Sequence, residues 1–157
     1  MKNVFSIFFK IVLFAFLTAL TQIGGLVYLL SISLNRKLKI TAFVFRTILF
    51  LALYGITTFG IVPTVAPLFG REKIKHTKVI KPTNYMTVIL NRNYVVPEIN
   101  SVLNKAENEL SGSGIHLNYL DGNFPFIAGF PLRPHLSHND GHKLDLSLVY
   151  ETSEGKI

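Results

Sequence analysis

The sequence predicts a membrane α-helical hairpin followed by a small α+β domain that is apparently truncated. Two long apolar runs predict the hairpin, because residues 11–34 and 47–69 contain no charged side chain. As helices they would each reach roughly 35 Å, which exceeds a hydrocarbon core of about 30 Å. The α+β domain is predicted by strand and helix patterns that begin only after residue 84.

The first apolar run is interpreted as a retained helix and not as a signal peptide. It is longer than a signal-peptide core of roughly 7–15 residues, and no small-residue cleavage pattern follows it. Small and polar residues near its middle suit close contact between helices. They are Thr18, Thr21, Gln22, Gly24 and Gly25.

The second apolar run, residues 47–69, contains Pro63 and Pro67, which should kink or end its helix. A short link at residues 35–39 predicts that the two spans form an antiparallel hairpin with both chain ends on one side. Neither span contains an ionisable residue, so no proton relay is indicated. Basic residues flank the spans at both ends, and the positive-inside rule therefore gives no clean orientation.

Charge is divided unevenly along a chain of 157 residues with a net charge of +7. Every charge in residues 1–70 is basic, whereas all acidic groups and all five histidines follow. Because the early basic residues flank apolar spans, we expect a lipid bilayer and no nucleic acid as partner. The chain has no cysteine, which excludes disulfides and thiolate chemistry.

Residues 71–83 are predicted to be a basic juxtamembrane linker at the membrane surface. Residues 84–157 are predicted to be a partial α+β domain, because the last strand ends where another strand is expected. Strands are predicted at 86–90, 115–119 and 144–149.

Between these strands a helix should begin at Pro97 and end at Gly112 and Gly114. Its spacing predicts one core-facing side and one outward side. The core-facing residues are Ile99, Val102, Leu103, Ala106 and Leu110, and the outward residues are Asn100, Lys105 and Glu109.

Residues 134–145 are the most informative stretch, with three histidines and two aspartates. Histidine nitrogen and aspartate oxygen are common zinc ligands. A turn permitted by Gly141 should bring His138 on a loop and Asp145 on the next strand to one ion, with Leu144 and Leu146 anchoring the strand. The alternative is an ordinary turn at residues 139–141 with solvated histidines.

The pattern His138-x-x-Gly141-x-x-x-Asp145 resembles the H-x-x-G-x-A-x-D core of LAS-type zinc peptidases. These include D-alanyl-D-alanine carboxypeptidases, lysostaphin-like endopeptidases and the hedgehog domain. The resemblance implies zinc as the cofactor and His138 and Asp145 as its ligands. Residues 119–146 also resemble a group of bacterial membrane proteins with the same two-span start, which brings no activity with it.

The chain departs from the peptidase pattern in several places. The usual serine two residues before the histidine is Leu136, and the usual alanine is Lys143. The family's third ligand, a histidine near the end of the domain, has no counterpart after Asp145. The open alternatives are His116, His135 and His142 as third ligand, Glu151 and Glu154 as general base, and Arg133 as a substrate-binding residue.

These features predict a membrane-anchored zinc metallopeptidase-like protein that acts on cell-wall peptides. With two ligands and no general base, the chain should bind zinc weakly and hydrolyse nothing as given. The alternatives are a non-catalytic membrane protein whose degenerate site binds a ligand or partner, and a structural membrane protein without metal. The resemblance places the protein in a bacterial inner membrane, with its C-terminal domain periplasmic or extracellular.

Overall fold

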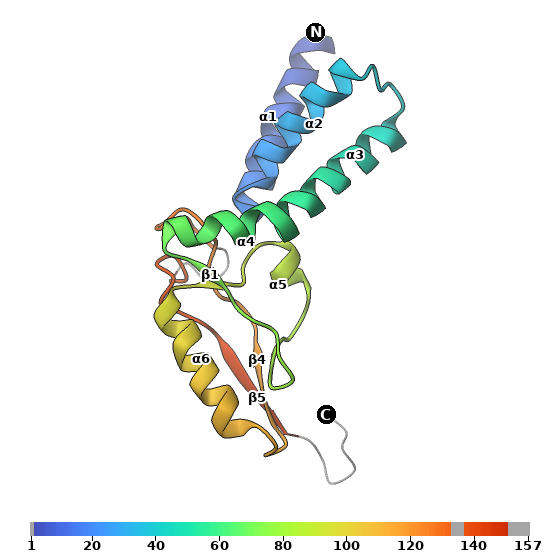
Figure 1. The fold of residues 1–157 in the computed structure, drawn as a ribbon. Coiled ribbons are helices and arrows are strands. Elements are labelled where there is room, and N and C mark those ends of the chain that lie inside the picture. The colour runs from blue at the N-terminus through green and yellow to red at the C-terminus, as the bar shows by residue number, and fades with distance from the viewer. Residues whose placement is uncertain (1, 133–136, 151–157) are drawn as a thin grey trace. The chain divides into compact units, whose positions relative to one another are not determined.

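The computed structural model describes residues 2–132 and 137–150 and contains two compact units, Met1–Thr64 and Val65–Ile157. The N-terminal unit is helical, and the C-terminal unit is a small mixed α+β region (Figure 1). This agrees with the predicted order of a helical part followed by an α+β part.

The N-terminal unit consists of α1 (Lys2–Thr21), α2 (Gly24–Lys37) and α3 (Phe43–Ile56). A π-helical turn at Thr57–Ile61, the short α4 (Val62–Val65) and a 3-10 turn at Ala66–Phe69 continue α3 along the chain. Two helical stretches, Val4–Thr21 and Phe43–Phe69, are long and apolar enough to span a membrane.

The predicted single helix over residues 11–34 is wrong, because the chain reverses at Gln22 and Ile23. Gln22 has a φ of 63°, which lies in the left-handed region and ends α1. The following Gly24 donates its N–H to Thr21 Oγ1 at 2.8 Å, which supports the tight turn. As a result, α1 and α2 form a hairpin within the stretch that was predicted to be one span (Figure 1).

Small residues at this turn allow α1 and α2 to approach closely. A Cβ on Gly24 would lie 2.9 Å from Leu17 O, and one on Gly25 would lie 2.7 Å from Phe14 O and also meet the Thr18 hydroxyl. The close contact expected from these residues therefore exists, but it joins α1 to α2 instead of joining the two predicted spans.

Most large apolar side chains of the N-terminal unit are exposed. None of the residues of α3 is buried, and Phe43, Phe45 and Ile56 are each more than 60% exposed. A helix from the core of a soluble protein would be buried. This surface has instead the character expected of a helix that contacts lipid.

The C-terminal unit contains a three-stranded sheet in the order β2 (Ile80–Pro82), β4 (Ile115–Tyr119) and β5 (Leu146–Tyr150). Strand β4 runs parallel to β2 and antiparallel to β5. A second, two-stranded sheet pairs β1 (Glu72–Lys73) with β3 (Tyr94–Val95). The helix α6 (Pro97–Leu110) packs through Leu103 into the core that also contains Leu117 and Tyr119.

Residues 71–83, predicted to be a linker, belong to this folded unit. Ile74, Val79 and Ile80 are buried in its core, and Arg71 is only 8% exposed. Lysines lie between the apolar residues of the segment, and Lys75, Lys78 and Lys81 remain exposed while the apolar residues enter the core. Because lysines are frequent in this segment, the sequence alone indicated an exposed linker.

The predicted strand at residues 86–90 is also wrong, because the segment forms the short helix α5 (Met86–Ile89). The side chain of Asn84 accepts a hydrogen bond from the Met86 N–H at 2.6 Å, which favours a helical turn. The turn ends at Asn91, whose φ is 58°.

Helix α6 and strand β4 lie at their predicted positions, but two residues of α6 lie on the face opposite to the predicted one. Val102 is 60% exposed, whereas Asn100 is buried and donates to Glu72 Oε2 at 3.0 Å and to Lys73 O at 3.3 Å. A paired amide is stable in a buried position, so hydrogen bonding to β1 outweighs the apolar spacing.

The last predicted strand is confirmed in part, since β5 begins at Leu146 and not at residue 144. Leu146 and Leu148 do not anchor it, because they are 46% and 56% exposed. Leu148 lies opposite the buried Leu117, but β5 is the outer strand of the sheet order and its face is less covered. Leu144, just before the strand, does pack against the core.

Candidate metal centre

The imidazole of His138 is held in one orientation by the loop that follows β4. The side chain is 4% exposed, and its Nδ1 lies 3.0 Å from the carbonyl oxygen of Gly122. Because a carbonyl only accepts hydrogen bonds, Nδ1 must carry the proton. In the neutral ring, Nε2 then presents its lone pair on the other side, the form in which histidine binds metals.

Asp145 is fixed by the backbone immediately before β5. Its N–H donates to Asp121 O at 3.0 Å, and its carbonyl accepts from Leu120 N at 2.9 Å. These bonds extend the β4–β5 pairing beyond Tyr119 and Leu146. The side chain is 39% exposed, and its Oδ1 lies 3.2 Å from His138 Nε2. The two predicted ligands therefore converge, as expected if both serve one site.

The geometry of this pair fits a shared metal ion. Two ligand atoms 2.0–2.2 Å from a tetrahedral zinc are separated by about 3.3–3.6 Å. The observed separation between His138 Nε2 and Asp145 Oδ1 is 3.2 Å, close to that range. The same distance also suits an ion pair between a carboxylate and a protonated imidazole, so the geometry is compatible with both states.

Asn123 connects the two segments that carry the pair, and the sequence analysis did not identify it. Its side chain is 1% exposed; Oδ1 accepts from the Gly141 N–H at 3.1 Å, and Nδ2 donates to Lys143 O at 2.7 Å. Its backbone also pairs with Tyr94 of β3. One buried amide thus fixes the loop between His138 and Asp145 to the domain.

Gly141 is required at its position for two reasons. Its φ is 88°, in the left-handed region, and a Cβ there would lie 2.7 Å from Arg71 Nε. Its carbonyl accepts from the Val96 N–H at 3.0 Å. The predicted role of Gly141 in a turn is confirmed, and the structure adds its contact with a buried guanidinium.

The turn itself is stabilised by local hydrogen bonds. Asp140 Oδ1 accepts from the His142 N–H at 2.9 Å, and this bond lowers the pKa of the Asp140 carboxyl. Lys143 Nζ donates to Ser137 O at 2.9 Å. The turn interpretation and the metal interpretation of this stretch are therefore compatible, because the turn is what brings His138 and Asp145 together.

A third ligand is not evident in the described part of the chain. Among residues 2–132 and 137–150, no three His, Cys, Asp or Glu side chains form a group able to hold a metal ion. His116 lies on β4 and contacts Lys78 O through Nδ1 at 3.0 Å, and His142 is exposed. The remaining candidates fall outside the described residues: Arg133, His135, Glu151 and Glu154.

A second polar contact, between His76 and Tyr119, was also missed by the sequence analysis. His76 Nε2 lies 2.6 Å from the Tyr119 hydroxyl, and its ring is near that of Tyr85. Burial, and then the charge of Lys73, lowers the pKa of His76. Burial raises the pKa of Tyr119, which therefore stays protonated and donates its hydrogen bond to the neutral imidazole.

Comparisons of the chain with family models, with curated proteins and with solved structures find no match. The candidate centre is therefore defined by its own geometry: one buried histidine of fixed tautomer, one partly exposed aspartate, and a loop held by Asn123 and Gly141.

Proposed function

We propose that this chain is a membrane-anchored, zinc metallopeptidase-like protein that acts on cell-wall peptides. The observation that carries the proposal is the convergence of His138 Nε2 and Asp145 Oδ1 at 3.2 Å. The resemblance of the surrounding residues to the LAS-type peptidase motif supports zinc as the ion and D-alanyl peptides as the substrate class.

His138 and Asp145 would hold the metal in this proposal, and Gly122 would keep the histidine in the correct tautomer. A zinc ion bound there would supply Lewis acidity and a water of lowered pKa. The partly exposed Asp145 leaves the side of the pair that faces solvent accessible to a peptide. The domain's own contribution is to position the ligands, through Asn123 and Gly141.

Membrane anchoring is supported by the exposed apolar surface of the N-terminal unit. The two stretches able to span a membrane are only 6% and 11% buried over their most apolar windows. Removing such a surface from water is favourable, and helices satisfy their own backbone hydrogen bonds in lipid. A bacterial inner membrane is the location that fits a cell-wall substrate.

An external C-terminal domain belongs to this proposal because cell-wall peptides lie outside the inner membrane. Because α2 returns alongside α1, the first half of α1 and the link after α2 lie at the same end of this unit (Figure 1). All six basic residues of the segment 1–70 are on α1, on α2, in the link or at the start of α3. Basic residues also follow the Phe43–Phe69 stretch, so the positive-inside rule does not decide the orientation, and the external placement rests on the cell-wall substrate class alone. These residues are Arg71, Lys73, Lys75, Lys78 and Lys81.

A second candidate function is a non-catalytic site that binds a ligand or partner. The observation in its favour is that the described residues offer no third metal ligand beside His138 and Asp145. Zinc requires three protein ligands and an open position for hydrolysis. Both candidates share metal binding by this pair and differ in whether a peptide bond is broken.

The zinc content of the purified full chain in detergent tests whether His138 and Asp145 bind metal, which both candidate functions require. His138→Asn keeps an amide near the position of Nδ1, able to donate to Gly122 O, but removes Nε2. It should abolish the weak zinc binding of the chain, and Asp145→Asn should weaken zinc binding by at least tenfold. His142→Asn is the matched control on the same loop and should retain zinc. Equal zinc in all variants, or none in the wild type, would contradict the proposal.

Hydrolysis of a D-alanyl-D-alanine-terminated peptide then separates the two candidates. Release of D-alanine by zinc-loaded wild-type protein, absent from His138→Asn, would favour the peptidase and would overturn the expectation that the chain as given hydrolyses nothing. A chain that binds zinc through His138 but releases no product from this peptide or from cross-linked cell-wall fragments would favour the non-catalytic site.

The orientation is tested separately. An alkaline phosphatase fusion after residue 150 should be active in cells, and an inactive fusion would contradict the proposed orientation.

A further inference from the structure

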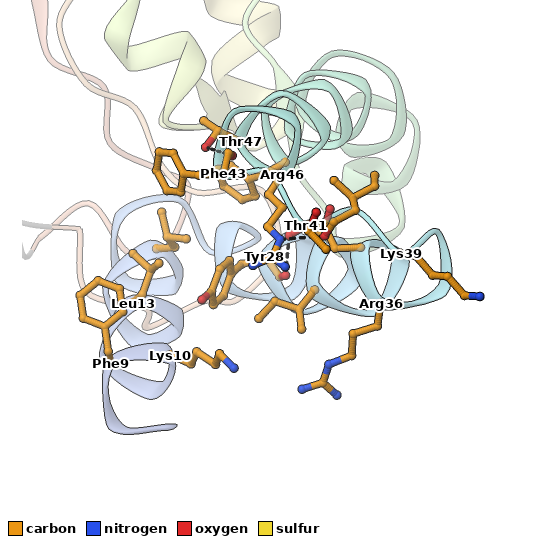
Figure 2. Close-up of a pocket in the computed structure, with 16 residues that line it drawn as sticks. Phe9, Lys10, Leu13, Tyr28, Arg36, Lys39, Thr41, Phe43, Arg46 and Thr47 are labelled. Atoms are coloured by element: carbon orange, nitrogen blue, oxygen red, sulfur yellow. Dashed lines mark hydrogen bonds between the residues drawn. The ribbon is translucent and has the colours of Figure 1, made fainter. Parts of the chain in front are cut away.

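The N-terminal unit contains a cavity of about 680 Å³ between α1, α2, the link and α3, far in sequence from the candidate metal centre. Its volume lies within the range of roughly 300–1,000 Å³ that is typical of small-molecule sites. Figure 2 shows residues from all of these segments around one hollow, with the side chain of Lys39 extending away from it. None of these residues takes part in the function proposed above.

The wall of the cavity is mainly apolar and aromatic. Tyr28 of α2 meets Phe50 of α3 edge to face, with ring centroids 6.3 Å apart, and Phe50 in turn stacks on Tyr54 at 6.0 Å. Helix α1 contributes a further apolar side of the hollow. Its lining residues are Phe9, Leu13 and Leu17. A hydrocarbon chain is the kind of group that such a wall binds.

The cavity is basic at the end near the link. Lys10 comes from α1, Arg36 from α2, Lys39 from the link and Arg46 from α3 (Figure 2). A neighbouring hollow shares Lys10 and Arg36. No acidic residue precedes Glu72 in the sequence, so no carboxylate of this unit neutralises these groups.

Two details indicate that the basic end of the cavity can bind a polar group. Arg46 Nε donates to Ile40 O at 2.9 Å, which fixes the guanidinium over the link. The side-chain oxygen of Asn35, another lining residue, is buried and accepts no hydrogen bond from any described residue. An unpaired buried acceptor is costly, and a ligand hydroxyl or ammonium would satisfy it.

We propose that this cavity binds one anionic phospholipid, with an acyl chain against the aromatic wall and the phosphate at Arg46, whose side chain points into the hollow (Figure 2). Basic pockets between membrane helices bind acidic lipid headgroups in this way. A headgroup that carries hydroxyls, such as glycerol, would also donate to Asn35. The site rests on the membrane placement proposed above but not on zinc or peptidase activity.

Native mass spectrometry of the full chain ejected from nanodiscs tests this site. In nanodiscs of equal phosphatidylglycerol and phosphatidylcholine, we expect one retained phosphatidylglycerol per chain. The variant Arg46→Gln should lower this preference several-fold, because a basic group near an anionic headgroup contributes that much to lipid binding. Millimolar inorganic phosphate should not displace the lipid, whereas a site for free phosphate would lose it.

Lys37→Gln is the matched control, because Lys37 lies at the same helix end but does not line the larger cavity. It should keep the preference for phosphatidylglycerol. Equal losses in both variants would show a general surface attraction and overturn the site, as would a wild-type chain without lipid preference. Release of the chain from membranes by alkaline carbonate would instead contradict the membrane placement itself, and the lipid site with it.

Discussion

The guanidinium of Arg71 lies against Gly141, a contact between the second residue after the helical segment and the centre of the candidate metal loop. All three atoms nearest to a Cβ built on Gly141 belong to this guanidinium, and Nε would be 2.7 Å away. Arg71 is 8% exposed, so it cannot move aside into solvent without opening the loop. The loop that bears His138 therefore depends on a residue that the sequence analysis assigned to a linker.

Replacing Gly141 by alanine should destabilise the C-terminal unit by about 2–4 kcal/mol and weaken zinc binding. The substitution combines backbone strain at a φ of 88° with the clash against Arg71. Gly129→Ala is the control, because Gly129 has a φ of 79° but open space around it. It should cost only about 1–2 kcal/mol. Thermal unfolding measures both.

A double variant separates the backbone strain at Gly141 from the clash with Arg71. Arg71→Ala should recover part of the loss in the Gly141→Ala background, since it removes the clash but leaves the strain. If Gly141→Ala and Gly129→Ala cost the same, with no coupling to Arg71, the packing argument is wrong.

Asn123→Ala should cost about 2–4 kcal/mol, because it leaves the Gly141 N–H and the Lys143 carbonyl buried without their partner. Asn123→Asp keeps the acceptor for Gly141 and loses the donor to Lys143, so its cost should be different at low and high pH. Chemical denaturation followed by circular dichroism measures the stability. An alanine variant as stable as the wild type would show that Asn123 does not hold the loop.

The sequence predicts the features that depend on residues close together in the chain, and it does not predict those that depend on contacts between distant segments. The helix beginning at Pro97 and the strand at residues 115–119 were predicted because their signals are local. The pairing of His138 with Asp145 was also predictable, since only residues 139–144, which include a turn, separate them. The break at Gln22 was not, because small and polar residues also occur inside a single membrane helix where it packs on another helix.

The missed parts of the site all rest on contacts between distant segments. Asn123 reaches residues 141 and 143, and Arg71 reaches Gly141. Asn100 is buried because Glu72 supplies its partner. None of these residues has a neighbour in sequence that reveals its role, so a buried polar residue on a loop resembles an ordinary turn residue until the fold is known.

The stability of the C-terminal unit should fall as the pH is lowered through the titration of His76. The pKa of His76 is lowered in the folded state, first by burial and then by Lys73. The unfolded chain, with a pKa near 6.5, therefore binds more protons in the window just below that value. Stability from this group is complete above about pH 6.5 and decreases as the pH falls toward the folded pKa.

Melting temperatures between pH 7.5 and 5.5 measure this effect, and the slope should be modest because His76 is exposed to solvent. His76→Gln should flatten the slope while keeping a hydrogen bond to Tyr119. Asp140, whose pKa is lowered, contributes only at more acidic pH. A wild-type slope that persists unchanged in the glutamine variant would assign the effect to another group.

The hairpin of α1 and α2 predicts opposite effects for one substitution at two glycines. Gly25→Ala should destabilise the N-terminal unit, because a Cβ would lie 2.7 Å from Phe14 O and would also strike the Thr18 hydroxyl. Gly55→Ala on α3 meets nothing within 4 Å and should stabilise its helix by about 0.5–1 kcal/mol, the usual gain of alanine over glycine. Thermal unfolding of the full chain in detergent compares them. If residues 11–34 formed one straight helix, both substitutions would stabilise it, so a gain for Gly25→Ala would refute the hairpin and the lipid cavity that it forms with α3.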